Sequence, residues 1–119
     1  MEPLGVHHVS INVSDVDAAL AFYTDVLGFG VRRDRPDFGF GGAWLDVGGQ
    51  QVHLIEGKVP DARGQHFAVR VDGLDAVIAE LRARGVEVSD PVPVGASRQA
   101  FLDDPCGNAI ELHEVGTGA

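Results

Sequence analysis

The chain opens with a strict alternation of apolar and polar residues. In the segment 6–13 the alternation is regular from residue 8 onward, with Val9, Ile11 and Val13 in one set and His8, Ser10 and Asn12 in the other. A period of two predicts a strand with one buried face. A helix is predicted next, because Val16, Leu20, Tyr23 and Leu27 recur at helical spacing before Gly28. Ser14 and Asp17 form an S-x-x-D start signal for this helix.

Three shorter strands are predicted after the helix, over residues 29–34, 41–47 and 50–56. The turn-rich stretch RPDFGFGG separates the first two, and Gly48-Gly49 separates the last two. The unit is therefore βαβββ. Residues 57–64, GKVPDARG, have the proline, glycine and charge content of a connector.

The same pattern then returns. A strand over residues 66–71 precedes a helix that Asp72 can cap and Gly85 can close. A short strand near 86–88, a loop over 89–97 and strands near 98–103 and 107–114 follow. A shift of 58 residues superposes His8 on His66 and His53 on Glu111. We therefore predict an α+β fold of two βαβββ modules, about 5–56 and 65–115. Half-length units of this size would be too small to be stable alone, so we expect one domain over residues 1–119.

Charge and cysteine content narrow the functional classes. Nine basic and eighteen acidic residues give a net charge of −9, which opposes binding to nucleic acid or to an anionic membrane. The single cysteine, Cys106, excludes an intrachain disulfide and a cysteine-rich zinc module. Neither a leader-like N-terminus nor a bilayer-spanning apolar run is evident. We expect a cytoplasmic protein without nucleic-acid or membrane partners.

Four polar residues share one strand face in the predicted modules. His8 and His66 lie on the first strand of each module, and His53 and Glu111 lie on the last. Strand parity places all four opposite the apolar residues that face the helices. A lone strand histidine is usually a hydrogen-bonded structural residue, but one offset and one parity relate all four. We therefore expect them to approach a common point and bind a divalent metal such as zinc, nickel, manganese or iron.

The two ends of the chain carry a family resemblance. The stretches VHHVSINVSDVDAALAFYTDVLGFGV and DDPCGNAIELHE resemble the opening and closing motifs of the vicinal oxygen chelate superfamily, which includes glyoxalase I, fosfomycin- and bleomycin-resistance proteins and extradiol dioxygenases. The resemblance implies an open, cup-shaped mixed sheet with the helices outside. It also implies metal ligands at His8, His53, His66 and Glu111 and a homodimer. GAWLDVGGQQVHLIEG resembles a short, single-domain, glyoxalase-I-like subgroup.

Other residues are weaker site candidates. His113 shares the face of Glu111 and is a candidate acid or base, with a structural strand-end histidine as the alternative. Arg70 and Arg98 are candidates to pair with an anionic substrate, or are solvated strand arginines. Phe38 and Phe40 are candidates to close over a ligand, or belong to an ordinary hairpin connection. Trp44 and Phe101 are candidates to line an apolar pocket, or are core residues.

These residues favour a metal-dependent enzyme acting on a small substrate with vicinal oxygens. The expected chemistry is that of a glyoxalase-like lyase or isomerase, in which a metal stabilises an enediolate and Glu111 binds the metal and can move a proton. Three alternatives remain open. They are an extradiol-type dioxygenase using iron on His8, His66 and Glu111, a metal-free protein that sequesters a drug as bleomycin-resistance proteins do, and a fosfomycin thiol transferase.

Overall fold

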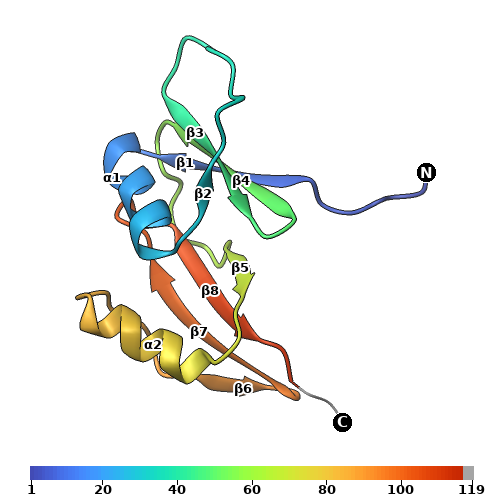
Figure 1. The fold of residues 1–119 in the computed structure, drawn as a ribbon, viewed down its shortest axis with the longest axis vertical. Helices are drawn as coiled ribbons and strands as arrows, with labels where there is room; N and C mark the ends of the chain where they lie inside the picture. Colours follow the sequence, from blue (N-terminus) through green and yellow to red (C-terminus); the bar gives the residue numbers. More distant parts are fainter. Residues whose placement is uncertain (117–119) are drawn as a thin grey trace. The chain divides into compact units, whose positions relative to one another are not determined.

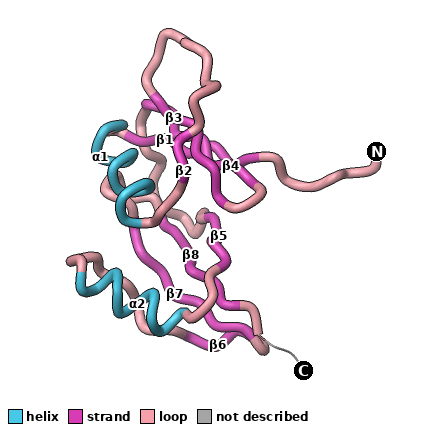
Figure 2. The backbone as a smooth tube through the Cα atoms, in the orientation of Figure 1, coloured by secondary structure: helices cyan, strands magenta, loops and turns pink. Residues whose placement is uncertain are grey.

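The computed structural model describes residues 1–116, and the chain divides after Asp61 into two compact units. Each unit is one βαβββ module with its own four-stranded mixed sheet, as Figures 1 and 2 show. The module repeat predicted from the sequence is therefore confirmed. No helix within residues 1–116 is long and apolar enough to cross a membrane.

The first module places its first and last strands side by side. Its elements are β1 (His8–Val13), α1 (Val16–Ala21), β2 (Gly30–Val31), β3 (Gly42–Val47) and β4 (Gln50–Glu56). The strand order is β1-β4-β3-β2. β1 runs parallel to β4, and the other pairs are antiparallel. The helix α1 packs on β3 and β4, against the buried side chains of Leu45, Val52 and Leu54.

The second module repeats this arrangement. Its elements are β5 (Phe67–Arg70), α2 (Leu74–Ala83), β6 (Val92–Val94), β7 (Ser97–Asp103) and β8 (Ala109–Glu114). The strand order is β5-β8-β7-β6, with β5 parallel to β8. The helix α2 packs on β8, and Ala100, Ile110 and Leu112 form the buried sheet face.

Both helices begin differently from the prediction. In α1 the N-cap is Asp15, whose Oδ1 accepts a hydrogen bond from the Ala18 N–H at 3.0 Å, so the cap assigned to Ser14 is wrong by one residue. In α2 the N-cap is Gly73, in a left-handed conformation with φ 66° and no side-chain cap, so Asp72 is not the cap. The Leu74 N–H instead donates to Glu114 Oε2 at 2.8 Å. This acceptor is distant in sequence, which local capping rules do not foresee.

The first helix also changes type along its length. After Ala21 the chain continues as a π-helical turn, η1 (Phe22–Val26), and Gly28, at φ 78°, follows the helix end. The helix keeps its predicted extent, but the wider π-helical turn shifts its last residues around the helix axis. Tyr23, in this turn, is fully buried.

Two predicted strands are corrected. Residues 86–88 are not a strand, because the Val86 N–H donates to the Leu81 carbonyl at the helix end and the Ser89 N–H to the Phe101 carbonyl. The edge strand of this sheet is β6 instead. Pro93 is tolerated there because one side of an edge strand makes no backbone hydrogen bonds to another strand. The strand predicted over 29–34 shrinks to β2. A long loop, residues 32–41, then connects it to β3 (Figure 2).

Gly42, at the start of β3, is required for close packing. A Cβ on this residue would overlap the Leu54 carbonyl oxygen and lie 3.1 Å from Arg35 Nη2. We expect Gly42→Ala to lower the free energy of unfolding by about 1–3 kcal/mol. Gly49→Ala is the matched control, since nothing lies within 4 Å of its Cβ position, and it should change stability by no more than about 0.5 kcal/mol. Urea unfolding measures both, and equal midpoints for the two variants would contradict the packing argument.

Candidate metal centre

The predicted donors of the first module lie together on one sheet face. His53 is in register with Ser10 on β1 and Trp44 on β3, and His8 is in register with Gln51. His8 and His53 are therefore diagonal neighbours, and their rings stack with centroids 4.0 Å apart at 15°. This face is opposite Val52 and Leu54, as strand parity predicted.

Burial keeps His53 neutral. The residue is only 8% exposed, and desolvation, followed by the nearby His8, lowers its pKa below the ordinary value. Its Nε2 lies 2.8 Å from Gln51 Oε1, and the Trp44 ring stacks on its other face with centroids 4.5 Å apart. When Nε2 donates to the amide oxygen, Nδ1 keeps its lone pair. A neutral imidazole with a free lone pair is the form that binds a metal.

His8 has a partner that parity did not predict. The Nδ1 atoms of His7 and His8 lie 2.9 Å apart, and the two rings meet edge to face. One of these nitrogens must carry the proton. When His8 Nδ1 is the donor, its Nε2 keeps the lone pair that a metal needs. Strand alternation does not apply to His7, because it precedes the first residue of β1.

The second module joins a histidine, a carboxylate and a second histidine. Glu111 Oε1 lies 3.0 Å from His66 Nε2, and Glu111 Oε2 lies 2.7 Å from His113 Nδ1. On the far side of the His66 ring, Nδ1 lies 2.9 Å from the Gly64 carbonyl, to which it donates. Glu111 is 8% exposed. A carboxylate buried to this degree is tolerated because both oxygens have partners.

The orientation of His66 calls for a cation beside Glu111. Because Nδ1–H is committed to the Gly64 carbonyl, the neutral ring directs its Nε2 lone pair at the Glu111 carboxylate. Two acceptors at 3.0 Å repel unless a proton or a metal ion lies between them. The pKa of His66 is accordingly raised, first by the Gly64 carbonyl and then by Glu111. A proton and a metal ion would therefore compete for this position.

An aromatic side chain flanks the donors in each module. Trp44 is the β3 residue in register with His53, and Phe101 is the β7 residue in register with Glu111. Phe101 meets the His66 ring edge on, with centroids 5.2 Å apart. Both aromatic residues thus share the face of the predicted ligands. Phe38, on the 32–41 loop, has its centroid 6.1 Å from that of Trp44, and Phe40 stacks on Phe38.

The two candidate arginines lie on opposite faces of the second sheet. Arg70 is in register with His113, so it shares the face of Glu111 and is exposed. Arg98 is in register with Glu114, on the helix face. Its guanidinium bonds both oxygens of Asp75 on α2 at 3.1 Å and Glu114 Oε1 at 3.0 Å. Arg98 therefore ties α2 to the sheet, and the structure does not bring it to the Glu111 face.

The donors are presented as pairs within the modules. Among residues 1–116 no three or more histidine, cysteine, aspartate or glutamate side chains are arranged to hold a metal by themselves. His8 with His53, and His66 with Glu111, are each two donors of the type that zinc, nickel, manganese and iron accept. The chemistry of each pair fits such an ion.

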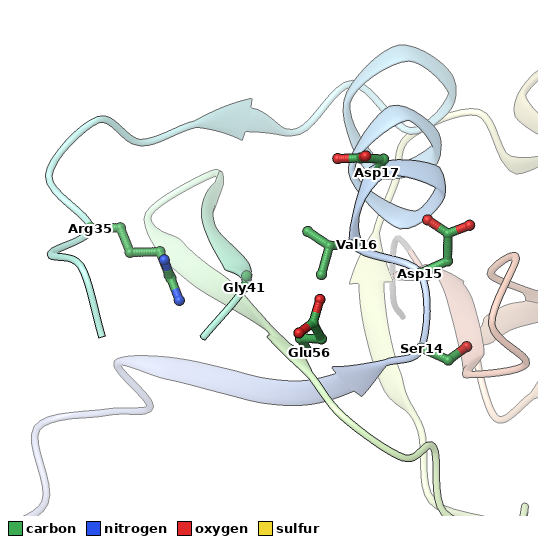
Figure 3. Close-up of a pocket in the computed structure, with 8 residues that line it drawn as sticks. Ser14, Asp15, Val16, Asp17, Arg35, Gly41 and Glu56 are labelled. Atoms are coloured by element: carbon green, nitrogen blue, oxygen red, sulfur yellow. The ribbon is translucent and has the colours of Figure 1, made fainter. Parts of the chain in front are cut away.

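A cavity in the first module lies apart from these donors. It has a volume of about 490 Å³ and is lined where β1 and β4 end by Ser14, Asp15, Val16, Asp17, Arg35, Gly41, Gly42 and Glu56. Figure 3 shows the Arg35 side chain extending toward Gly41 and the Glu56 side chain directed toward Val16. Three carboxylates against one guanidinium make the cavity net acidic. None of the predicted metal ligands lines it.

Comparison with known proteins now defines the family. A family sequence model, that of the Glyoxalase/Bleomycin resistance protein/Dioxygenase superfamily, matches residues 5–112. The YaeR protein of Escherichia coli K12 is 33% identical over 92% of this chain and 95% of its own length. A probable chloroplastic lactoylglutathione lyase of Arabidopsis thaliana is 32% identical over 92% of this chain, which spans 35% of that protein.

A solved structure shares the fold. The structure of TnmS3, an antibiotic binding protein from a Streptomyces species, matches with a TM-score of 0.82 and 30% identity, covering 96% of this chain and 98% of that one. The relatives therefore include both an enzyme and a binding protein. With a family match over most of its length, two βαβββ modules and these relatives, the chain belongs to the Glyoxalase/Bleomycin resistance protein/Dioxygenase superfamily.

Proposed function

We propose that the protein is a metal-dependent lyase or isomerase of the glyoxalase type, acting on a small substrate with vicinal oxygens. The metal ligands are His8 and His53 of the first module and His66 and Glu111 of the second. The observation that carries this proposal is the His66 Nε2 atom facing Glu111 Oε1 at 3.0 Å while Nδ1 is held by the Gly64 carbonyl. That arrangement suits a divalent cation in place of the proton.

The donor set determines what the site can do. Three neutral imidazoles and one carboxylate leave a net charge of +1 on a divalent ion. When bound, such an ion polarises a substrate carbonyl and acidifies the adjacent C–H. Glu111 would then be the carboxylate that takes this proton, and its Oε2 atom is 2.7 Å from His113 Nδ1. His113, whose side chain is 30% exposed, can pass a proton between Glu111 and solvent.

Sequestration of a drug without metal is the second candidate. The relation to the antibiotic binding protein TnmS3 favours it, as do the half-exposed rings of Phe38 and Phe40. Against it stand the four candidate ligands, each with a fixed orientation or a hydrogen-bonded partner. We further propose a cytoplasmic homodimer, on the strength of the family resemblance.

Exchange of a substrate C–H with solvent tests the enzymatic proposal. We expect protein loaded with nickel or zinc to incorporate deuterium from D₂O at the carbon beside the carbonyl of small α-hydroxyketones and of the hemithioacetal of methylglyoxal with glutathione. Proton NMR follows the loss of signal. Metal-free protein and free metal at the same concentration are the controls. Metal-loaded protein that exchanges no faster than these controls on every compound would contradict the proposal.

A further inference from the structure

We propose that Gln51 is a positioning residue of the metal centre, which keeps the proton of His53 on Nε2 so that His53 binds the metal through Nδ1. This inference rests on the proposed function and deepens it, because it assigns the ligand atom of His53 and names the residue that selects it. His66 presents the opposite nitrogen, since its Nδ1 is held by the Gly64 carbonyl and its Nε2 faces Glu111. The two modules therefore offer histidine ligands that use different ring nitrogens.

Two stacked rings hold the plane of the His53 imidazole. The His8 ring lies parallel to it with centroids 4.0 Å apart at 15°, and the Trp44 ring does so at 4.5 Å and 11°. The N–H bond and the nitrogen lone pair of an imidazole both lie in the ring plane. Stacking therefore hinders rotation of the His53 ring but leaves both of its nitrogens able to bind a partner at the ring edge.

The Gln51 side chain determines which of these nitrogens carries the proton. Its Oε1 atom lies 2.8 Å from His53 Nε2, and an amide oxygen can only accept a hydrogen bond. Nε2 must therefore donate, and because a neutral imidazole has a single N–H, Nδ1 keeps the lone pair. Within residues 1–116 no hydrogen bond engages His53 Nδ1. Nδ1 is thus the atom that His53 can offer to a metal ion.

The place of Gln51 in the sheet makes it a firm support for this hydrogen bond. Gln51 and His53 are two residues apart on β4, so their side chains share one sheet face. β4 lies between β1 and β3, and Gln51 is in register with His8 on one side and Asp46 on the other. A partner carried by an interior strand orients a ligand more precisely than one carried by a loop.

Removal of the amide oxygen is expected to weaken metal binding. In Gln51→Leu the Nε2 proton has no acceptor, so the proton can move to Nδ1 and block the ligand atom. We expect the affinity for zinc and nickel to fall about tenfold or more, as on loss of other residues that orient a metal ligand. Gln51→Glu keeps an acceptor oxygen and should retain the affinity. Isothermal titration measures both variants.

Nitrogen NMR of the histidine rings separates positioning from a merely structural role. Long-range ¹H–¹⁵N correlations show which ring nitrogen carries the proton, and the His53→Asn variant identifies the His53 signals. We expect the proton on Nε2 in both the metal-free and the zinc-loaded protein, and a loss of this preference in metal-free Gln51→Leu. Gln50→Leu is the matched control, because Gln50 is exposed and has the opposite strand parity. It should change neither the proton position nor the metal affinity.

The outcomes for this inference and for the proposed function are distinct. A proton on His53 Nδ1 in the zinc-loaded protein would overturn the inference and leave the metal proposal standing. So would a lower metal affinity in Gln51→Leu without a change in the proton position. If the unchanged protein binds no metal, the proposed function fails. The metal-free spectra then still decide whether Gln51 sets the tautomer: a proton that moves in Gln51→Leu supports that role, and one that stays on Nε2 overturns it.

Discussion

Replacement of Glu111 by glutamine is expected to weaken binding of nickel or zinc by about 100-fold or more. The substitution keeps the shape of the side chain and removes the only anionic donor of the proposed set. It also replaces the charged carboxylate opposite His66 Nε2 with a neutral amide, and the loss of even an indirect partner of a ligand commonly costs 10–100-fold. Isothermal titration with each metal measures the change.

Glu114→Gln is the matched control for this variant. Glu114 lies on the same strand three residues later but on the helix face, where it accepts from the Leu74 N–H and from Arg98. Those two donors lower its pKa, so the carboxylate is charged and structural. We expect Glu114→Gln to bind metal as the unchanged protein does. Equal metal affinity in Glu111→Gln and the unchanged protein, or equal losses in both variants, would contradict the assignment.

The apparent affinity for metal is expected to fall about tenfold for each pH unit below the raised pKa of His66. The proton and the metal compete for His66 Nε2, so binding displaces one proton. The pKa of His66 lies above its ordinary value of 6.5, whereas burial lowers that of His53. His66 is therefore protonated first as the pH falls and sets the window in which metal binds.

The stability of the metal-free protein should change in the opposite sense. A histidine whose pKa is raised on folding contributes stability that is fully present below its unfolded value and is lost as the pH rises through the folded value. The His66–Glu111 contribution is thus fully present below 6.5 and is lost as the pH rises through the raised pKa of His66 in the folded protein. The rise in melting temperature on adding nickel should grow between pH 5 and 8. An increment that is constant or shrinks with pH would contradict competition at His66.

The faces of the strands were predictable because alternation is a local rule. His53 and Glu111 were assigned to the face opposite Val52 and Leu112, and the registers place them there. The same rule was insufficient for Arg98. Its side chain is on the helix face by parity with Glu114, and only the register and the contact with Asp75 on α2 reveal that its charge is used structurally.

The contacts that orient the donors were not predictable, because they come from outside the strand pattern. His7 precedes β1, and the Gly64 carbonyl belongs to the connector before β5. Gln51 does lie on the face of His53, two residues away, and a glutamine beside a buried histidine is the one signal the sequence offered. The predicted N-cap of α2 was wrong for a similar reason, since the Leu74 N–H donates to Glu114, which is 40 residues away in the sequence.

The metal content of the purified protein tests the central claim most directly. The protein is dialysed against nickel, zinc, manganese or iron(II), then against metal-free buffer, and analysed by inductively coupled plasma mass spectrometry. We predict one retained ion per chain for at least one of these metals, and background levels in His66→Ala. Background metal in the unchanged protein after every dialysis, or full retention in His66→Ala, would contradict the proposed metal centre.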